Sequence, residues 1–144
     1  MVGFIVLAAL IATCSLVVSL HAWRKRDRDL VSEFGLRQFQ GKVTVSVFGD
    51  REEVPLSSGE IAQLRDLLQE CQYTPGKGRP AIPLKMPWQA TFYLADSRVL
   101  ILRVSGNRGC LWLCRDKADR EPIGASYEVP PRIESFVRSK LGRT

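Results

Sequence analysis

The sequence contains a single histidine, His21, which lies near the N-terminus. The folded part of the chain therefore has no imidazole, and this excludes a Ser-His-Asp or Cys-His catalytic arrangement within one chain. Histidine-based metal sites are excluded for the same reason. We interpret Glu52, Glu53, Glu60 and Asp66 as solvated charges and helix caps rather than as paired catalytic carboxylates. We expect a protein that is not an enzyme, with no cofactor, no bound metal and no evident small-molecule substrate.

Charge is missing from the start of the chain and balanced through its middle. Residues 1–20 contain no Asp, Glu, Lys or Arg, although the formal net charge of the whole chain is +6. Residues 24–28 and 132–144 contribute +3 each, whereas residues 29–131 contain 13 basic and 13 acidic side chains. Because the body of the chain is neutral, we do not predict nucleic-acid binding.

The uncharged run over residues 1–23 is long enough, as a helix, to cross a hydrocarbon core of about 30 Å. A cleaved signal peptide would have a basic segment before a shorter apolar core, and this chain has neither feature. We therefore predict an uncleaved transmembrane helix. A buried helix of a soluble protein is a further alternative.

Residues 11–14, with the sequence IATC, resemble the bacterial lipobox, at which lipoproteins receive their lipid. The match departs from the pattern at Thr13, where Gly, Ala or Ser is usual. The apolar run also continues beyond Cys14. A signal peptide or lipid anchor stays open as an alternative to the spanning helix.

The basic cluster that follows the run predicts the orientation of the chain. Its members are Arg24, Lys25, Arg26 and Arg28. Lys and Arg concentrate on the cytoplasmic side of membrane helices, so we assign these four residues as topology determinants and expect a cytoplasmic C-terminal domain. The predicted organisation is a transmembrane helix over 1–23, a juxtamembrane basic segment and linker over 24–41, and a small domain over 42–144.

Periodicity predicts the elements of that domain. Residues 43–47 alternate between apolar and polar, as a half-buried strand does. Ser57 and Glu60 fit a capping box, and an apolar stripe follows through Leu64 and Leu68 to Cys71, which predicts a helix over 57–71. After a proline-rich loop, we predict strands at 88–95, 98–104 and 110–115, a short extended piece at 124–129 and a helix over 129–141. The expected fold is α+β, in the order β-α-β-β-β-α, with a mostly antiparallel four-stranded sheet and two helices on one face.

The predicted strand 98–104 is apolar on both faces. If the helices cover one face, the other would present either Val99 and Ile101 or Leu100 and Leu102, with a mixture of Thr91, Tyr93, Trp112 or Leu113 beside them. Of these we select Val99, Ile101, Tyr93 and Trp112. An open surface of that kind would be an unusual apolar patch. We therefore predict that these four residues form a partner face, covered by another protein, by a second copy of the chain or by residues 29–40.

The spacing of the cysteines does not favour a disulfide, a metal site or a redox site. Cys110 and Cys114 would share one face of a strand at about 13 Å, too far apart to pair. Cys71 could approach one of them. An odd number of thiols in the domain suits a reducing cytosol, and we expect buried free thiols. A single disulfide, and a metal or redox site, stay open.

These patterns together predict a single-pass membrane protein whose α+β domain mediates protein interaction or assembly without catalysis. Its expected partners are the bilayer and either another protein or a second copy of the chain. The alternative is an extracytoplasmic ligand-binding or sensing domain, held by an uncleaved signal or a lipid anchor.

Overall fold

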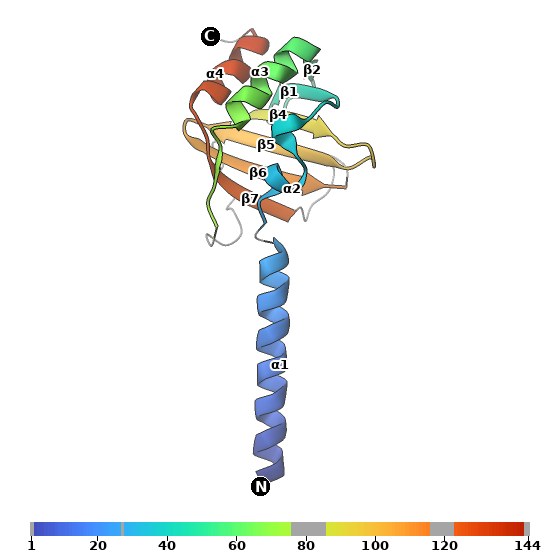
Figure 1. The fold of residues 1–144 in the computed structure, drawn as a ribbon, viewed down its shortest axis with the longest axis vertical. Helices are drawn as coiled ribbons and strands as arrows, with labels where there is room; N and C mark the ends of the chain where they lie inside the picture. Colours follow the sequence, from blue (N-terminus) through green and yellow to red (C-terminus); the bar gives the residue numbers. More distant parts are fainter. Residues whose placement is uncertain (1, 27, 76–85, 116–122, 143–144) are drawn as a thin grey trace.

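The computed structural model of the chain describes residues 2–26, 28–75, 86–115 and 123–142, without the side chains of 2, 19–26 and 123. It is an α+β protein built on one antiparallel sheet, from which a long N-terminal helix projects (Figure 1). The helices are α1 Val2–Arg26, α2 Leu30–Glu33, the 3-10 turn η1 Leu36–Gln38, α3 Ser58–Leu68 and α4 Arg132–Lys140. The strands are β1 Val43–Val47, β2 Val54–Pro55, β3 Gln72–Tyr73, β4 Trp88–Tyr93, β5 Val99–Ser105, β6 Arg108–Cys114 and β7 Ile123–Glu128.

The sheet has seven strands in the order β2-β1-β4-β5-β6-β7-β3, and the prediction of four is wrong. The extended piece expected near 124–129 is β7, a full strand that pairs with β6 from Ile123 to Glu128. Strands β2 and β3 have two residues each. Strands that short contain no alternation from which a sequence pattern can be recognised.

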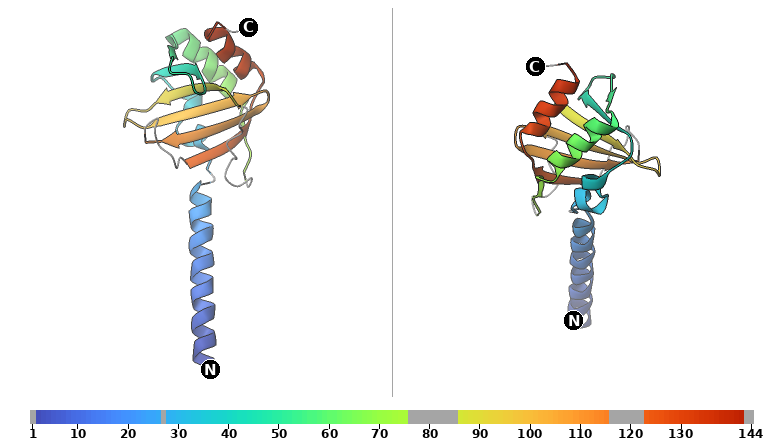
Figure 2. Two further views of the ribbon diagram at one scale, coloured as in Figure 1. Left: turned by 180° about the vertical axis from the view of Figure 1, so that it is seen from behind. Right: turned by 45° about the horizontal axis from the view of Figure 1, so that its top comes forward.

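The two predicted helices are present as α3 and α4 and are shorter than the predicted ranges 57–71 and 129–141. The Ser57 side chain accepts a hydrogen bond from the Glu60 main-chain N–H at 3.3 Å, which confirms the cap of α3. Helix α4 begins directly after Pro131, whose fixed φ suits a first turn. Figure 2 shows α3 and α4 lying across the same face of the sheet.

The main core lies between that face and the helices. Strands β4, β5 and β6 contribute alternate apolar residues to it, and α3 and α4 contribute their inner stripes. Its largest fully buried side chains include Phe92, Leu100, Leu102, Leu111, Leu64, Leu68 and Ile133. We call the opposite side of the sheet the far face; it carries the alternate positions that include Thr44, Gln89, Val99, Cys110 and Gly124.

Part of the predicted 24–41 linker belongs to this core. Leu30, Val31 and Leu36 are buried in it, on the helix side rather than on the far face. The Arg37 guanidinium donates to the main-chain carbonyls of Leu68 and Cys71 at 3.2 and 2.9 Å. These contacts fix the segment to the C-terminal end of α3.

A hydrogen-bonded group joins the same segment to β7. The Tyr127 hydroxyl donates to Asp29 Oδ1 at 2.7 Å and accepts from the Val31 main-chain N–H at 3.0 Å. Asp29 also caps α2 by accepting from Ser32. Burial raises the pKa of Asp29, but the hydrogen bonds from Tyr127 and Ser32 outweigh burial and leave it below its ordinary value. Both the donor and the acceptor capacity of the buried phenol are used.

Within the part of the chain that the structure describes, no helix combines the length and the apolar character that crossing a membrane requires. The spanning helix over residues 1–23 stays a prediction.

Candidate functional sites

Helix α1 exposes apolar side chains in every direction. Consecutive residues such as Phe4, Ile5, Val6 and Leu7 are all exposed, so the apolar surface is not confined to one stripe. The exposed set continues with Leu10, Ile11, Leu16, Val17 and Val18. A helix that is apolar all round is usually buried in an apolar environment, and the described part of the chain leaves these side chains of α1 exposed.

The predicted basic cluster is described only in part. The main chain is helical through Arg26, but the side chains of Arg24, Lys25 and Arg26 lie outside the described residues. Arg28 is described, and its guanidinium pairs with Glu33 at 3.3 Å.

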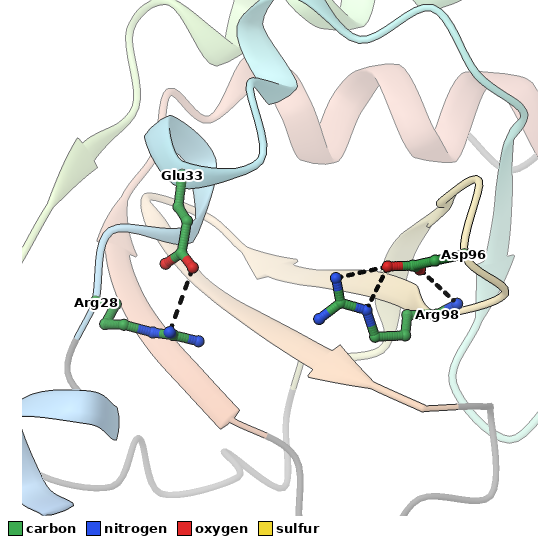
Figure 3. A network of polar contacts seen from close by, with 4 residues as sticks. All are labelled: Arg28, Glu33, Asp96 and Arg98. Atoms are coloured by element: carbon green, nitrogen blue, oxygen red, sulfur yellow. Dashed lines mark hydrogen bonds and ion pairs between the residues drawn. The ribbon is translucent and has the colours of Figure 1, made fainter.

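A second ion pair lies near Arg28 and Glu33. Arg98 pairs with Asp96 at 2.6 Å, and its guanidinium carbon lies 5.3 Å from the centre of the Phe34 ring. Figure 3 shows both pairs close to α2 and the sheet. Exposed ion pairs of this kind contribute little to stability. The carboxylate of Glu33 nevertheless compensates the charge of Arg28, one of the four residues assigned to topology.

The far face brings together the four residues of the predicted partner face. Val99, Ile101 and Trp112 are 4%, 8% and 9% exposed and pack into a second apolar cluster with Met86, Cys110 and Cys114. Tyr93 packs against this cluster, and its hydroxyl donates to Glu53 at 2.7 Å. Three of the four positions are therefore buried within the single chain, and residues 29–40, one of the predicted covers, pack on the other side of the sheet. A partner on this face remains a prediction.

A polar row that sequence reasoning missed crosses the far face beside this cluster. Strand register aligns Ser46, Gln89, Arg103, Cys110 and Ser126 on five neighbouring strands. The Gln89 amide donates from Nε2 to Ser46 Oγ at 2.8 Å. Arg103 then donates from Nε to Gln89 Oε1 at 3.4 Å. One signal was available in the sequence: a lone arginine inside the otherwise apolar run of β5.

Arg103 is the charged member of this row. Its side chain is half-buried, and its guanidinium carbon lies 4.2 Å from the centre of the Phe48 ring. Burial lowers the pKa of Arg103 from its ordinary value. Its charge nevertheless persists at neutral pH, because an arginine does not deprotonate in proteins.

Two buried polar atoms on the far face have no hydrogen-bond partner among the described residues: Trp112 Nε1 and Thr44 Oγ1. Buried polar atoms in folded proteins are nearly always paired, so each exception calls for an explanation. The two positions belong to one register row, next to that of Arg103.

All four cysteines are free. Cys71 lies in the helix-side core, whereas Cys110 and Cys114 lie on the far face, so the sheet separates them. Burial raises the pKa of Cys71 to about 11 although the Arg37 charge opposes it. Burial likewise raises the pKa of Cys110, against the opposing effects of Ser126 and Arg103. At neutral pH both are protonated thiols, the unreactive form.

Across the described ranges, no three His, Cys, Asp or Glu side chains are grouped so that they could hold a metal ion. Comparison of the chain with protein-family models, with curated proteins and with solved structures finds no match. The function must therefore be argued from these surfaces alone.

Proposed function

We propose that the chain is a membrane-tethered binding protein without catalytic activity, in which the apolar run of residues 1–23 crosses the bilayer and the α+β domain contacts a protein partner. Residues 1, 2 and 19–23 of this run have no described side chains, so the run is longer than the stretch of α1 whose apolar surface the structure describes. The observation that carries the proposal is the apolar surface of α1, exposed on all sides beside a domain with its own closed core. A helix with such a surface is stable in lipid, or against another apolar surface, but not in water.

The cytoplasmic side is the proposed location of the domain. The basic cluster lies at the C-terminal end of the apolar run, and positive charge is retained on the cytoplasmic side. Three free, buried thiols in the domain suit a reducing compartment. The binding role is supported by the far face, where two buried polar atoms have no partner among the described residues.

Membrane attachment is tested by fractionation of the full chain. We expect the wild-type chain to stay with membranes in alkaline carbonate, as integral proteins do. Replacing Leu7, Leu10 and Ile11 with Asp should release it, because each buried charge opposes insertion by roughly 3 kcal/mol. The matched control places three Asp residues at Gln63, Gln69 and Gln72, which are exposed in the domain, and should leave fractionation unchanged. Release of the wild-type chain by carbonate would refute the spanning helix.

Orientation is tested with reporters fused to Thr144, one active only in the cytoplasm and one active only outside it. Activity of the inside reporter supports the cytoplasmic domain. Activity of the outside reporter would overturn the charge argument and favour an extracytoplasmic ligand-binding domain held by its uncleaved signal or by a lipid at Cys14.

A further inference from the structure

The charge of Arg103 lacks the compensation that other arginines of the domain have. Arg28, Arg98, Arg132 and Arg138 pair with carboxylates of other described residues. Arg37 and Arg65 are oriented instead by main-chain carbonyls. Arg103 has a neutral amide as its hydrogen-bond acceptor and no ion pair among the described residues.

This lack of a counter-charge matters because Arg103 is half-buried on β5, the middle strand of the sheet. Partial removal of a charge from water is costly unless an opposite charge or good acceptors replace the water. The neighbours in the polar row, Gln89 and Cys110, are neutral groups. An anion that reached the guanidinium would supply the negative charge that the described residues do not.

The surroundings leave one part of the guanidinium available. Gln89 is held by its bond to Ser46, so its carbonyl oxygen takes the Nε–H of Arg103. The Phe48 ring lies close to the guanidinium carbon, in a cation–π contact. The two terminal amino groups of Arg103 have no acceptor among the described residues, so they form an unused fork of N–H donors.

The geometry of that fork selects the chemistry of the ligand. Two parallel N–H groups match the two oxygens of a carboxylate, which binds arginine in a bidentate manner. One positive charge also balances a carboxylate better than it balances a doubly charged phosphate group. Phe48 is 57% exposed, so it offers an apolar surface beside the charge for the carbon chain of the ligand.

We propose that Arg103, oriented by Gln89 and flanked by Phe48 on the far face, is a binding site for the carboxylate of a ligand. This inference rests on the proposed binding role of the domain and names the chemistry that the domain recognises. The carboxylate could come from a small organic acid or from a peptide, and the experiment below separates these sources.

The test is an NMR titration of the full chain in zwitterionic detergent micelles, in which the Arg103 Nε–H resonance is followed. We expect sodium acetate to shift it saturably, whereas sodium chloride at equal ionic strength does not. The variant R103K keeps the charge but loses the fork, so its affinity for acetate should fall about tenfold or more, measured on the Trp112 indole resonance. The matched control R98K changes an arginine already paired with Asp96 and should stay within about twofold of wild type.

Peptides identify the source of the carboxylate. A short peptide with a free C-terminus, the same peptide amidated, and an amidated peptide with one internal Asp are compared with acetate. If only the first peptide binds more tightly than acetate, the ligand is a peptide C-terminus. If the third binds more tightly, the ligand is an acidic side chain. If no peptide binds more tightly than acetate, the ligand is a small organic acid.

Two outcomes would overturn the site: equal shifts with chloride and acetate, or unchanged acetate affinity in R103K. If R103K does not fold, the comparison of chloride with acetate on the wild-type chain still decides whether Arg103 binds a carboxylate specifically. Neither result bears on carbonate extraction or reporter topology. Failure of this site and failure of the membrane proposal are therefore distinguishable.

Discussion

The two faces of the seven-stranded sheet differ in how they treat buried polar atoms. On the helix side, the Tyr127 hydroxyl both donates to Asp29 and accepts from the Val31 N–H. On the far face, Trp112 Nε1 and Thr44 Oγ1 have no partner among the described residues, and Arg103 has no counter-charge there.

From this difference we expect the helix side to contribute most of the stability and the far face to be the binding surface. Paired polar atoms within an apolar core stabilise the fold, and the helix side has both. Arg138 Nε of α4 is an exception on the helix side, since it is buried without a partner among the described residues. Polar groups that are buried without partners oppose folding. Native proteins contain few of them, and each calls for an explanation such as a role in function. Such a role on the far face is consistent with the carboxylate site proposed at Arg103.

The largest predicted effect comes from breaking the helix-side core. Phe92 is 1% exposed and makes an edge-to-face contact with Phe39, at 5.4 Å between ring centres. The variant F92A should lower the free energy of unfolding by about 3–5 kcal/mol, because it removes a large buried ring and leaves a cavity. Urea unfolding of the full chain in micelles, followed by tryptophan fluorescence, measures the change.

Phe48 provides the matched control for that variant, since it is exposed on the other side of the molecule. The variant F48A should cost less than about 1 kcal/mol, most of it from the contact with Arg103. Equal losses in the two variants would mean that the far face contributes to stability as strongly as the core does.

The second prediction removes a polar contact from the helix side. The variant Y127F deletes the hydroxyl that joins β7 to Asp29 and Val31, and it leaves the Val31 N–H without its acceptor. We expect a loss of about 1–3 kcal/mol in the same unfolding experiment. Tyr93 serves as the comparison, because its hydroxyl binds Glu53 in a less buried place; Y93F should cost about half as much or less.

Most of the elements could be predicted from the sequence because their signals are local. The alternation of β1, the cap at Ser57 and the apolar stripe of α3 each involve neighbours within a few residues. The strand count could not be predicted in the same way. The two-residue strands β2 and β3 are defined by their partners, β1 and β7, which lie far along the chain or across a turn.

The far-face residues were likewise predictable only in part, because some of their properties depend on contacts between distant strands. Alternation along a strand indicates which residues share a face, and strand register places Val99, Ile101, Trp112 and Tyr93 on one side of the sheet. Alternation left open whether that side or the side of Leu100 and Leu102 would carry the helices. The sequence did not predict their burial, which depends on the rest of the chain. It also missed the row through Ser46, Gln89 and Arg103, because register between strands is not encoded in any single strand.

The third prediction concerns the loss of stability at low pH, part of which we assign to protonation of Asp29. The pKa of this carboxyl is lower in the folded chain than its ordinary value, because hydrogen bonds from Tyr127 and Ser32 outweigh burial. Its contribution to stability is therefore complete above the unfolded pKa, about 4, and is lost as the pH falls through the lower folded pKa. Unfolding measured from about pH 6 down to about pH 2 should show a shallower loss of stability in D29N than in wild type.

Y127F sharpens this result, because it removes one of the hydrogen bonds that lower the pKa of Asp29. Its acid dependence should lie between those of wild type and D29N. If D29N loses stability in acid as steeply as wild type, the linkage to Asp29 is wrong.

The smallest predicted effect is an increase in the free energy of unfolding, and it comes from a variant on the far face. Thr44 is 2% exposed on β1, and its hydroxyl has no partner among the described residues. The variant T44V keeps the branched shape and removes the unpaired oxygen. It should raise the free energy of unfolding by about 0.5–1 kcal/mol in the urea experiment.

Ser46 lies two residues further along the same strand and on the same face, but its hydroxyl accepts from Gln89. The variant S46A should therefore lower stability by about 1 kcal/mol, because the Gln89 amide loses its acceptor. It should also weaken acetate binding at Arg103, since Gln89 would no longer be held in place. Opposite signs on one strand would show that the far face combines an unpaired position, which opposes folding, with a paired row that orients the arginine. A loss of stability in T44V would instead mean that the Thr44 hydroxyl is satisfied in the folded protein, and that the contrast between the two faces is smaller than the structure indicates.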